Sequence, residues 1–240
     1  MIYREKVVTR IDDFDGSGKM RPTAVLKLLE NTASHHIALV AGDVLESSMQ
    51  GITWMMTEWR VEILRTPDHR DKLQAETWAT GNPPEIRNRR EIRLLTEDGE
   101  VLVNAEMVSA LFDLKAQRVI RIDEEVLAPY QPEDRYLFET EPPRFQMPEH
   151  CTLEKQLTVR RSDVDFNGHA HNTVFLDYAL EPLPLDAFAK RPVKAFRVAL
   201  RRQLRYGQTL TARGARTEDG YTVGLVNEEG VLCGGADIRL

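Results

Sequence analysis

The residues best suited to chemistry lie between 163 and 172, where acidic, amide and imidazole side chains alternate. Asp165, Asn167 and His169 are spaced two apart, so in an extended segment their side chains share one face. Residues 173–180 then read as a short helix. Backbone N–H groups at a helix start can polarise a carbonyl oxygen, while a carboxylate or imidazole can orient or deprotonate water. The pattern therefore predicts hydrolytic chemistry.

A structural role for the same residues has to be weighed against this interpretation. Asp and Asn are ordinary turn and capping residues, and a histidine near a helix start is commonly a surface or capping residue. Capping needs only one such side chain, whereas here three share a face. We therefore interpret Asp165, Asn167 and His169 as candidate catalytic residues.

Composition describes a folded protein with a core of its own. The 240 residues are 42% hydrophobic and 29% charged, which suits one large or two small domains, and we expect two. The net charge of −6 argues against non-specific binding to nucleic acid or to an anionic membrane. The two cysteines, Cys151 and Cys233, give no disulfide framework and suggest a reducing compartment. No spacing of ligands indicates a metal, and we expect no cofactor.

The ends and the hydropathy of the chain favour a cytoplasmic location. The first residues, Met1-Ile-Tyr-Arg-Glu-Lys6, are charged and lack the apolar stretch of a signal peptide. No apolar run approaches the ~20 residues of a membrane span. Cytoplasmic residence is therefore our default expectation.

The first half of the chain reads as one strand, one long helix and four further strands. The helix is predicted from Pro22 to near Gly42, with apolar residues at helical spacing over much of its surface. The strands are predicted at 3–11, 52–64, 72–80, 87–95 and 101–114. This order predicts an α+β unit in which an antiparallel sheet curls around the helix.

A proline-rich segment separates the two halves of the chain. Residues 124–150 hold five prolines among acidic residues, which favours an extended connector rather than a packed element. We therefore expect an N-terminal domain over 1–123, a linker over 124–150 and a C-terminal domain over 151–240.

The second half repeats the order of the first, so the chain is interpreted as a tandem duplication. Asp163-Val-Asp-Phe-Asn-Gly168 has the Asp-x-Asp-x-x-Gly spacing of Asp13-Phe-Asp-Gly-Ser-Gly18, and a helix follows both. In this alignment Asn167 corresponds to Ser17 and His169 to Lys19. Strands are predicted at 194–206, 209–216, 221–226 and 231–239. We expect the second copy to carry the chemistry and the first to serve as scaffold or substrate pocket.

These residues and their order resemble a known family. A strand, a loop with Asp165-Phe-Asn-Gly168 and a helix resemble the hot-dog thioesterases. Two fused copies, with Trp54-Met-Met-Thr57, Glu76-Thr-Trp78 and the Arg89-Arg90 pair, resemble the acyl-ACP thioesterases of plants and bacteria. The resemblance implies two tandem hot-dog domains that release a fatty acid from acyl carrier protein (ACP), the partner that carries the acyl chain.

The resemblance also assigns roles to residues. The family's Asp-x-Asn-x-His motif falls on Asp165, Asn167 and His169. The family places a glutamate, followed in the plant enzymes by a cysteine, where this chain has Gln203 and Leu204. An amide can orient water but cannot accept its proton at neutral pH. We therefore expect Asp165 to be the base, His169 to be the second candidate, and Asn167 and Gln203 to hold the water or carbonyl. Direct attack by water and an acyl-aspartate intermediate both stay open.

Two runs of arginines stand out in an otherwise acidic chain, and several functional alternatives stay open. The runs comprise Arg87, Arg89, Arg90 and Arg93, then Arg201, Arg202 and Arg205. They are either a solvated strand face or a patch that steers an acidic carrier protein. An acyl-CoA thioesterase and a non-catalytic acyl-binding or regulatory protein are the alternative functions. A lyase is a third reading, and a homodimer is left open.

Overall fold

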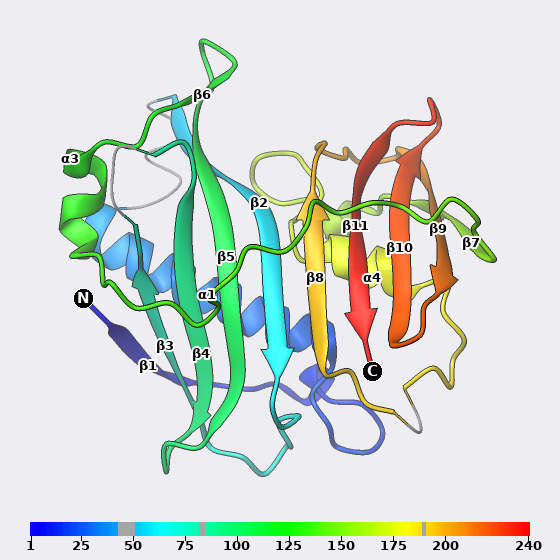
Figure 1. Ribbon diagram of the computed structural model, residues 1–240, viewed down its shortest axis with the longest axis horizontal. Helices are drawn as coiled ribbons and strands as arrows, with labels where there is room; N and C mark the ends of the chain where they lie inside the picture. Colours follow the sequence, from blue (N-terminus) through cyan, green and yellow to red (C-terminus); the bar gives the residue numbers. More distant parts are fainter. Residues whose placement is uncertain (43–50, 82–84, 189–190) are drawn as a thin grey trace. The chain divides into compact units, whose positions relative to one another are not determined.

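The computed structural model describes residues 1–42, 51–81, 85–188 and 191–240. The chain divides into two compact units, Met1–Glu141 and Pro142–Leu240, so the division falls inside the proline-rich segment. Each unit is an antiparallel sheet with a helix, as the sequence predicts (Figure 1). Among the described residues, no helix is long and apolar enough to cross a membrane.

The first unit places its strands in the order β1-β3-β4-β5-β2, with the short β6 paired to β5. All these pairs are antiparallel. The elements are β1 (Tyr3–Val7), η1 (Ile11–Asp13), α1 (Pro22–Ala41), β2 (Ile52–Ile63), β3 (Leu73–Ala79), β4 (Asn88–Thr96), β5 (Val101–Asp113), β6 (Arg118–Ile120), α3 (Glu124–Leu127) and η2 (Ala128–Tyr130).

The second unit places its strands in the order β8-β11-β10-β9-β7, again with antiparallel pairs throughout. The elements are β7 (Leu153–Thr158), η3 (Arg161–Asp163), α4 (Val174–Leu180), β8 (Ala195–Leu200), β9 (Thr209–Arg216), β10 (Gly220–Asn227) and β11 (Leu232–Arg239). The strand predicted over 209–216 has these limits in the structure.

Helix α1 forms where the sequence predicts it. Pro22 begins the helix, where a missing N–H costs no hydrogen bond. The helix ends before Gly42, whose φ of +81° suits glycine. Its buried side includes Leu29 and Ala33, which pack against the sheet and give the first unit its core.

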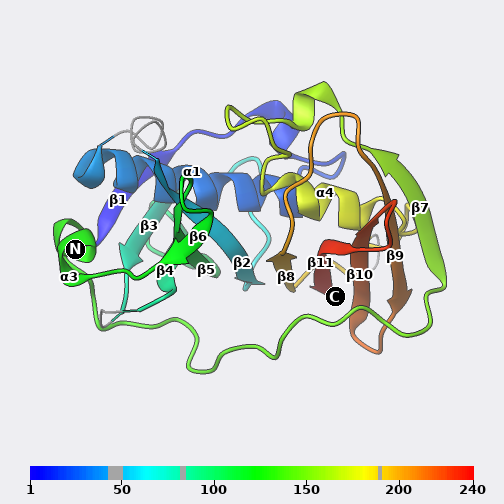
Figure 2. The same ribbon diagram turned by 90° about the horizontal axis from the view of Figure 1, so that it is seen from above.

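The proline-rich segment is packed, which differs from the extended connector expected over 124–150. Leu127 and Tyr130 are buried with Ile122 in a core cluster next to α3. The Trp78 indole then donates a 2.8 Å hydrogen bond to the carbonyl of Arg135. Figure 2 shows α1 on one face of the first sheet and the segment 131–141 along the other. Sequence composition missed this packing because burial of Leu127 and Tyr130 depends on distant segments, and because the other contacts use backbone carbonyls, which every residue possesses.

Strand β8 is shorter than the strand predicted over 194–206. The N–H groups of Arg201 and Arg202 both donate 2.9 Å hydrogen bonds to the carbonyl of Cys233. Two consecutive residues facing one carbonyl interrupt the ladder in the manner of a bulge. Residues 201–206 therefore lie in an irregular segment, and that segment contains Gln203.

Candidate functional site

The candidate site is a closed loop between η3 and α4. Gly168 donates a 3.0 Å hydrogen bond to the carbonyl of Asp165, and the N–H of Asp165 donates one of 2.9 Å to the carbonyl of His169. Gly168 has a φ of +76°, which a residue with a side chain rarely adopts. His171 closes the base of the loop with a 2.8 Å hydrogen bond to the carbonyl of Asp163.

Asp163 anchors this loop and is a residue that the sequence analysis did not single out. Its side chain is buried, and its Oδ2 accepts hydrogen bonds from the Tyr178 hydroxyl at 2.7 Å and the Arg160 N–H at 2.9 Å. Burial acts to raise the pKa of Asp163, but the hydrogen bonds from Arg160 and Tyr178 outweigh it and lower that pKa. The signal in the sequence was a tyrosine on the predicted helix, but its partner follows only from the fold.

The three motif residues lie together at the tip of the loop. Oδ1 of Asp165 accepts a 2.8 Å hydrogen bond from the N–H of Asn167, which orients the carboxylate. His169 is half-buried, and its Nε2 has no hydrogen-bond partner among the described residues. Burial and then the Arg205 charge lower the pKa of His169, while Asp165 opposes the shift. The imidazole is therefore neutral at pH 7 and able to accept a proton.

The segment after β8 lies against the loop and carries the fourth predicted residue. The N–H of Ala170 donates a 2.7 Å hydrogen bond to the carbonyl of Leu204. Gln203 precedes Leu204 and is exposed, whereas Leu204 is buried. The structure thus gathers Asp165, Asn167, His169 and Gln203 on two neighbouring segments of the second unit.

The first amides of α4 are engaged within the helix start. Val174 donates to the carbonyl of His171 at 3.0 Å, and Leu176 donates to the carbonyl of Thr173 at 3.2 Å. Phe175 makes a longer contact of 3.4 Å to the carbonyl of Asn172. The expectation that the amides of this helix polarise a substrate carbonyl is therefore wrong for residues 174–176.

The first unit contains the same loop, which supports the predicted duplication. Gly18 donates a 3.0 Å hydrogen bond to the carbonyl of Asp15, and its φ is +78°. Asp15 donates to the carbonyl of Lys19 at 2.8 Å, and its Oδ1 accepts the N–H of Ser17 at 2.8 Å. These bonds repeat those of the second loop with a constant offset in numbering. Ser17 thus stands where the second loop has Asn167, and Lys19 where it has His169.

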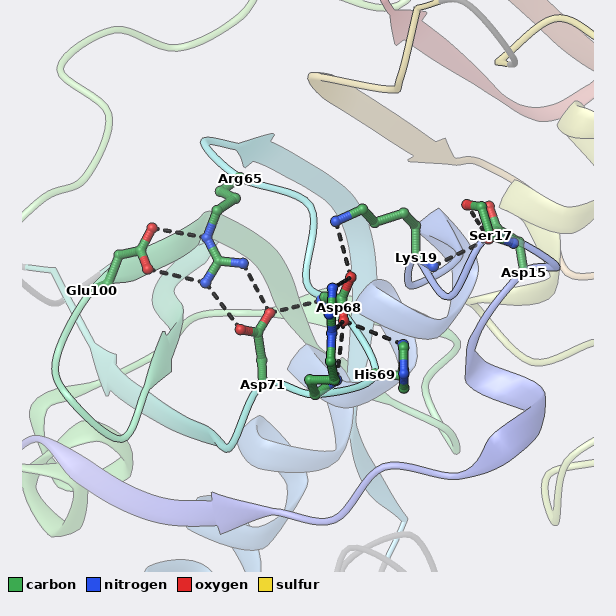
Figure 3. A network of polar contacts seen from close by, with 9 residues as sticks. Asp15, Ser17, Lys19, Arg65, Asp68, His69, Asp71 and Glu100 are labelled. Atoms are coloured by element: carbon green, nitrogen blue, oxygen red, sulfur yellow. Dashed lines mark hydrogen bonds and ion pairs between the residues drawn. The ribbon is translucent and has the colours of Figure 1, made fainter.

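Ion pairs fill the first loop and its surroundings (Figure 3). Nζ of Lys19 lies 3.1 Å from Oδ2 of Asp68, and the same carboxylate accepts a 2.9 Å hydrogen bond from Arg70. These hydrogen bonds lower the pKa of Asp68. Arg65 bridges Asp71 and Glu100 alongside. The copy without the motif thus holds its polar groups in ion pairs, while the copy with the motif retains a neutral imidazole.

Exposed aromatic and basic side chains surround the second loop. Phe166 and Tyr206 are 63% and 60% exposed, and the Arg161 guanidinium stands 5.3 Å from the centroid of the Tyr206 ring. Arg202 and Arg205 are exposed on the neighbouring segment. This surface, comprising Arg161, Phe166, Arg202, Arg205 and Tyr206, is called the loop rim below.

Arg89 and Arg90 of β4 do not form such a surface. This corrects the expectation that the first basic run is a solvated strand face or a steering patch. Arg90 is 3% exposed and donates a 2.8 Å hydrogen bond to Nδ1 of His36. Arg89 forms an ion pair with the buried Glu106. Neighbouring residues of a strand point to opposite faces, and here α1 covers one face and residues 131–141 cover the other.

Comparison with known proteins places the chain in a family. Residues 1–130 match the model of the acyl-ACP thioesterase N-terminal domain, and residues 147–234 match the model of the C-terminal domain. The chain belongs to the acyl-ACP thioesterase family. The recognition made from the short motifs is therefore confirmed.

Individual relatives agree with this assignment. A chloroplastic dodecanoyl-[acyl-carrier-protein] hydrolase of Cinnamomum camphora is 25% identical over 99% of this chain and 66% of its own length. A chloroplastic palmitoyl-acyl carrier protein thioesterase of Gossypium hirsutum is 26% identical over 85% of this chain and 53% of its own length. The chain thus spans about half to two thirds of the length of these curated relatives.

Solved structures confirm the fold. An acyl-ACP thioesterase from Bacteroides thetaiotaomicron superposes with a TM-score of 0.88 at 18% identity and covers 99% of this chain and 97% of that one. The 12:0-ACP thioesterase from Umbellularia californica superposes with a TM-score of 0.87 at 18% identity, covering 99% and 96%. The fold is therefore the tandem hot-dog fold expected from the sequence.

Proposed function

We propose that this chain hydrolyses the thioester of a fatty acyl group carried by ACP and releases free fatty acid. Membership of the family and the names of the curated relatives support this activity. The observation that carries it is the loop of the second unit, which holds a carboxylate, an amide and a neutral imidazole together. A mechanism without cofactor or metal suits these side chains.

In the proposed reaction, a water oxygen attacks the thioester carbonyl carbon, the C–S bond breaks and the thiol of the carrier leaves with a proton. Asp165 takes the proton from water through Oδ2, because its Oδ1 accepts a hydrogen bond from the backbone N–H of Asn167. His169 is the second candidate for this role, since its neutral imidazole can also accept a proton. Asn167 and Gln203 orient the water or the carbonyl.

The two units divide the work in this proposal. The first unit supplies the acyl pocket along the sheet-facing side of α1, where Leu29 and Ala33 lie. Its loop lacks the motif and is filled by the Lys19–Asp68 ion pair, so the chemistry belongs to the second unit. We propose domain limits of 1–123 and 151–240. We also propose a cytoplasmic location, whereas the plant relatives are named as chloroplastic.

The loop rim is the proposed contact for an acidic carrier. Its arginines, Arg161, Arg202 and Arg205, are exposed beside the candidate catalytic residues. Because the chain as a whole is acidic, with a net charge of −6, a local basic rim would orient an acidic partner toward this end of the second unit.

Thiol release from acyl-ACP and from acyl-CoA of matched chain lengths tests the function. Cys151 is exposed and Cys233 buried, so a Cys151→Ser variant removes the background reaction of the protein with the thiol reagent. We expect hydrolysis of acyl-ACP, with a loss of about 100-fold or more in Asp165→Asn. Asp15→Asn is the matched control, because Asp15 makes the same loop contact in the first unit.

Three outcomes would redirect the proposal. Release of thiol only from acyl-CoA would favour the acyl-CoA thioesterase alternative. Binding of acyl chains without any thiol release would favour the non-catalytic acyl-binding alternative. Normal turnover by Asp165→Asn would remove Asp165 as the base and leave His169.

A further inference from the structure

A second polar cluster is buried in the first unit, away from the loops described above. It joins Arg90 of β4, His36 of α1 and Tyr130 of η2, which are 3%, 0% and 2% exposed. Nη1 of Arg90 lies 2.8 Å from Nδ1 of His36, and the guanidinium stands 5.2 Å from the centroid of the Tyr130 ring. The His36 ring meets the Tyr130 ring edge to face at 5.7 Å.

The hydrogen bond between Arg90 and His36 fixes the proton of the imidazole. Arginine can only donate, so Nδ1 of His36 accepts and Nε2 carries the hydrogen. Burial, the Arg90 charge and the terminal amine lower the pKa of His36 to about 4, so the ring is neutral at pH 7. Nε2 of His36 is buried without a hydrogen-bond partner among the described residues, and the buried hydroxyl of Tyr130 has the Trp54 side chain beside it.

The cluster also lacks a negative charge. Burial lowers the pKa of Arg90 to about 10, which still leaves the guanidinium charged at neutral pH. In the part of the chain that the structure describes, no carboxylate forms an ion pair with Arg90; Nη1 is bonded to His36 and reaches Thr77 Oγ1 at 3.4 Å. A buried cation without a counter-charge is unfavourable, and the unpaired Nε2–H of His36 beside it adds to the cost.

Apolar side chains surround these donors. Tyr130 belongs to a buried cluster with Ile122 and Leu127, and partly exposed apolar residues pack against that cluster. This apolar collar consists of Ile37, Val40, Trp54, Ile120 and Val126. Donors and one cation next to partly buried apolar side chains match a ligand that has a carboxylate at one end and a hydrocarbon chain behind it.

We propose that Arg90, His36 and Tyr130 bind the carboxylate of an aliphatic chain. The carboxylate is either the head group of a free fatty acid or the distal carboxylate of an acyl chain that lies along α1. His36 follows Ala33 by three residues and Leu29 by seven on α1, so the cluster continues the side of the helix proposed to line the acyl pocket. Binding of a free acid does not require the proposed hydrolysis, so either proposal can fail without the other.

The experiment compares free ligands that differ only in charge. Binding of decanoate, decanamide and decanedioate to the full chain is measured by calorimetry for the wild type, Tyr130→Phe and His36→Gln. Tyr3→Phe is the matched control, because the Tyr3 ring stacks on His36 while its hydroxyl bonds to Glu5 instead. We expect decanoate or decanedioate to bind at least about tenfold more tightly than decanamide, and Tyr130→Phe to lose about tenfold for the carboxylates alone.

The arms of the experiment separate the two sources of the carboxylate. Preference for decanoate assigns the site to a free fatty acid head group. Preference for decanedioate, with faster release of a distal-carboxylate acyl chain from ACP than of its methyl-ended counterpart, assigns it to the end of a bound acyl chain. Equal binding of decanoate, decanedioate and decanamide, or carboxylate binding unchanged in both Tyr130→Phe and His36→Gln, would overturn the proposal. Circular dichroism of each variant checks that a loss of binding is not a loss of fold.

Discussion

The hydroxyl of Tyr178 donates a 2.7 Å hydrogen bond to Oδ2 of Asp163, so helix α4 holds the base of the candidate catalytic loop. The carbonyl of Asp163 also accepts the N–H of His171, on the far side of the same loop. One buried aspartate therefore connects the start of the loop, its end and the helix. This contact fixes where Asp165 and His169 stand.

Removing this contact should reduce catalysis more than it reduces stability. In Tyr178→Phe, Asp163 keeps Arg160 as a partner, and we expect the free energy of unfolding to fall by about 1–2 kcal/mol. The loop would lose its rigid base, so kcat should fall with little change in KM. Tyr221→Phe in β10, another buried tyrosine of the same unit, is the control. Equal kcat in the two variants would show that Asp163 does not position the loop.

The titration of His169 should respond in opposite directions to its two charged neighbours. The Arg205 charge lowers the pKa of His169 and the Asp165 charge raises it. Arg205→Gln should therefore raise that pKa, and Asp165→Asn should lower it further. NMR titration of the imidazole signals measures both shifts, and His169→Gln identifies the resonance. Shifts of the same sign would place one of the two groups away from the imidazole.

Charge reversal should have different effects in the two arginine runs: on KM at the loop rim and on stability at β4. Arg202→Glu or Arg161→Glu on the loop rim should raise KM for acyl-ACP, leave kcat nearly unchanged and weaken the salt dependence. Arg90→Glu should instead destabilise the first unit by about 3–5 kcal/mol, because it would bury a carboxylate without a cation and remove the donor to Nδ1 of His36. Urea unfolding and kinetics at two salt concentrations measure the two effects. A KM independent of both rim charges and salt would mean that the rim arginines are exposed to solvent but do not contact the carrier.

A larger side chain on α1 should change the preferred acyl length if the first unit holds the acyl chain. Ala33 is buried on the sheet-facing side of the helix. Ala33→Leu adds methylene volume there, which costs about 1–3 kcal/mol for ligands that need the space. A profile of released fatty acids should move to shorter chains. Leu39→Met on the exposed side of α1 is the control, and an unchanged profile in Ala33→Leu would place the acyl chain elsewhere.

Glu91 should make the stability of the first unit depend on pH. Its side chain is fully buried on β4, and burial, with the Glu106 charge adding to it, raises its pKa from 4.5 to about 8. The folded state therefore holds a proton that the unfolded chain releases, so the free energy of unfolding falls as pH rises from about 4.5 toward 8. Glu91→Gln removes this loss, and we expect it to gain about 1–3 kcal/mol at pH 8 relative to pH 5. Denaturant unfolding at both values measures the gain, and parallel pH curves for variant and wild type would contradict it.

Much of the fold was predictable because the pattern of residues is strong where packing is regular. The helix from Pro22 and the repeated Asp-x-Asp-x-x-Gly loops follow from local rules, and the structure places both as expected. Hydrophobic spacing and turn chemistry are properties of neighbouring residues. They can therefore be recognised in the sequence without knowledge of any tertiary contact.

The parts that failed depend on contacts between distant segments. Arg89 and Arg90 read as an exposed basic run, yet each lies under a cover that comes from elsewhere in the chain. Strand β8 ends at Leu200 because the carbonyl of Cys233, on another strand, accepts hydrogen bonds from the N–H groups of both Arg201 and Arg202. In the candidate site the motif gave three residues, but the Asp163–Tyr178 contact required the helix to be placed. The spacing of neighbouring residues in the sequence does not identify these distant contact partners.

The covered segment after η2 has a consequence for how the chain can vary. Its carbonyls accept hydrogen bonds from side chains of the nearby strands. The donor and acceptor pairs are Trp78 with Arg135, Arg89 with Phe138, Arg60 with Thr140, Arg197 with Pro143, and Arg201 with Phe145. A peptide carbonyl is chemically the same at every residue, proline included. Phe138 and Phe145 are the exceptions, because their rings are buried. Substitutions at exposed positions of the segment should therefore be tolerated as long as these two rings and the donating arginine and tryptophan side chains are kept.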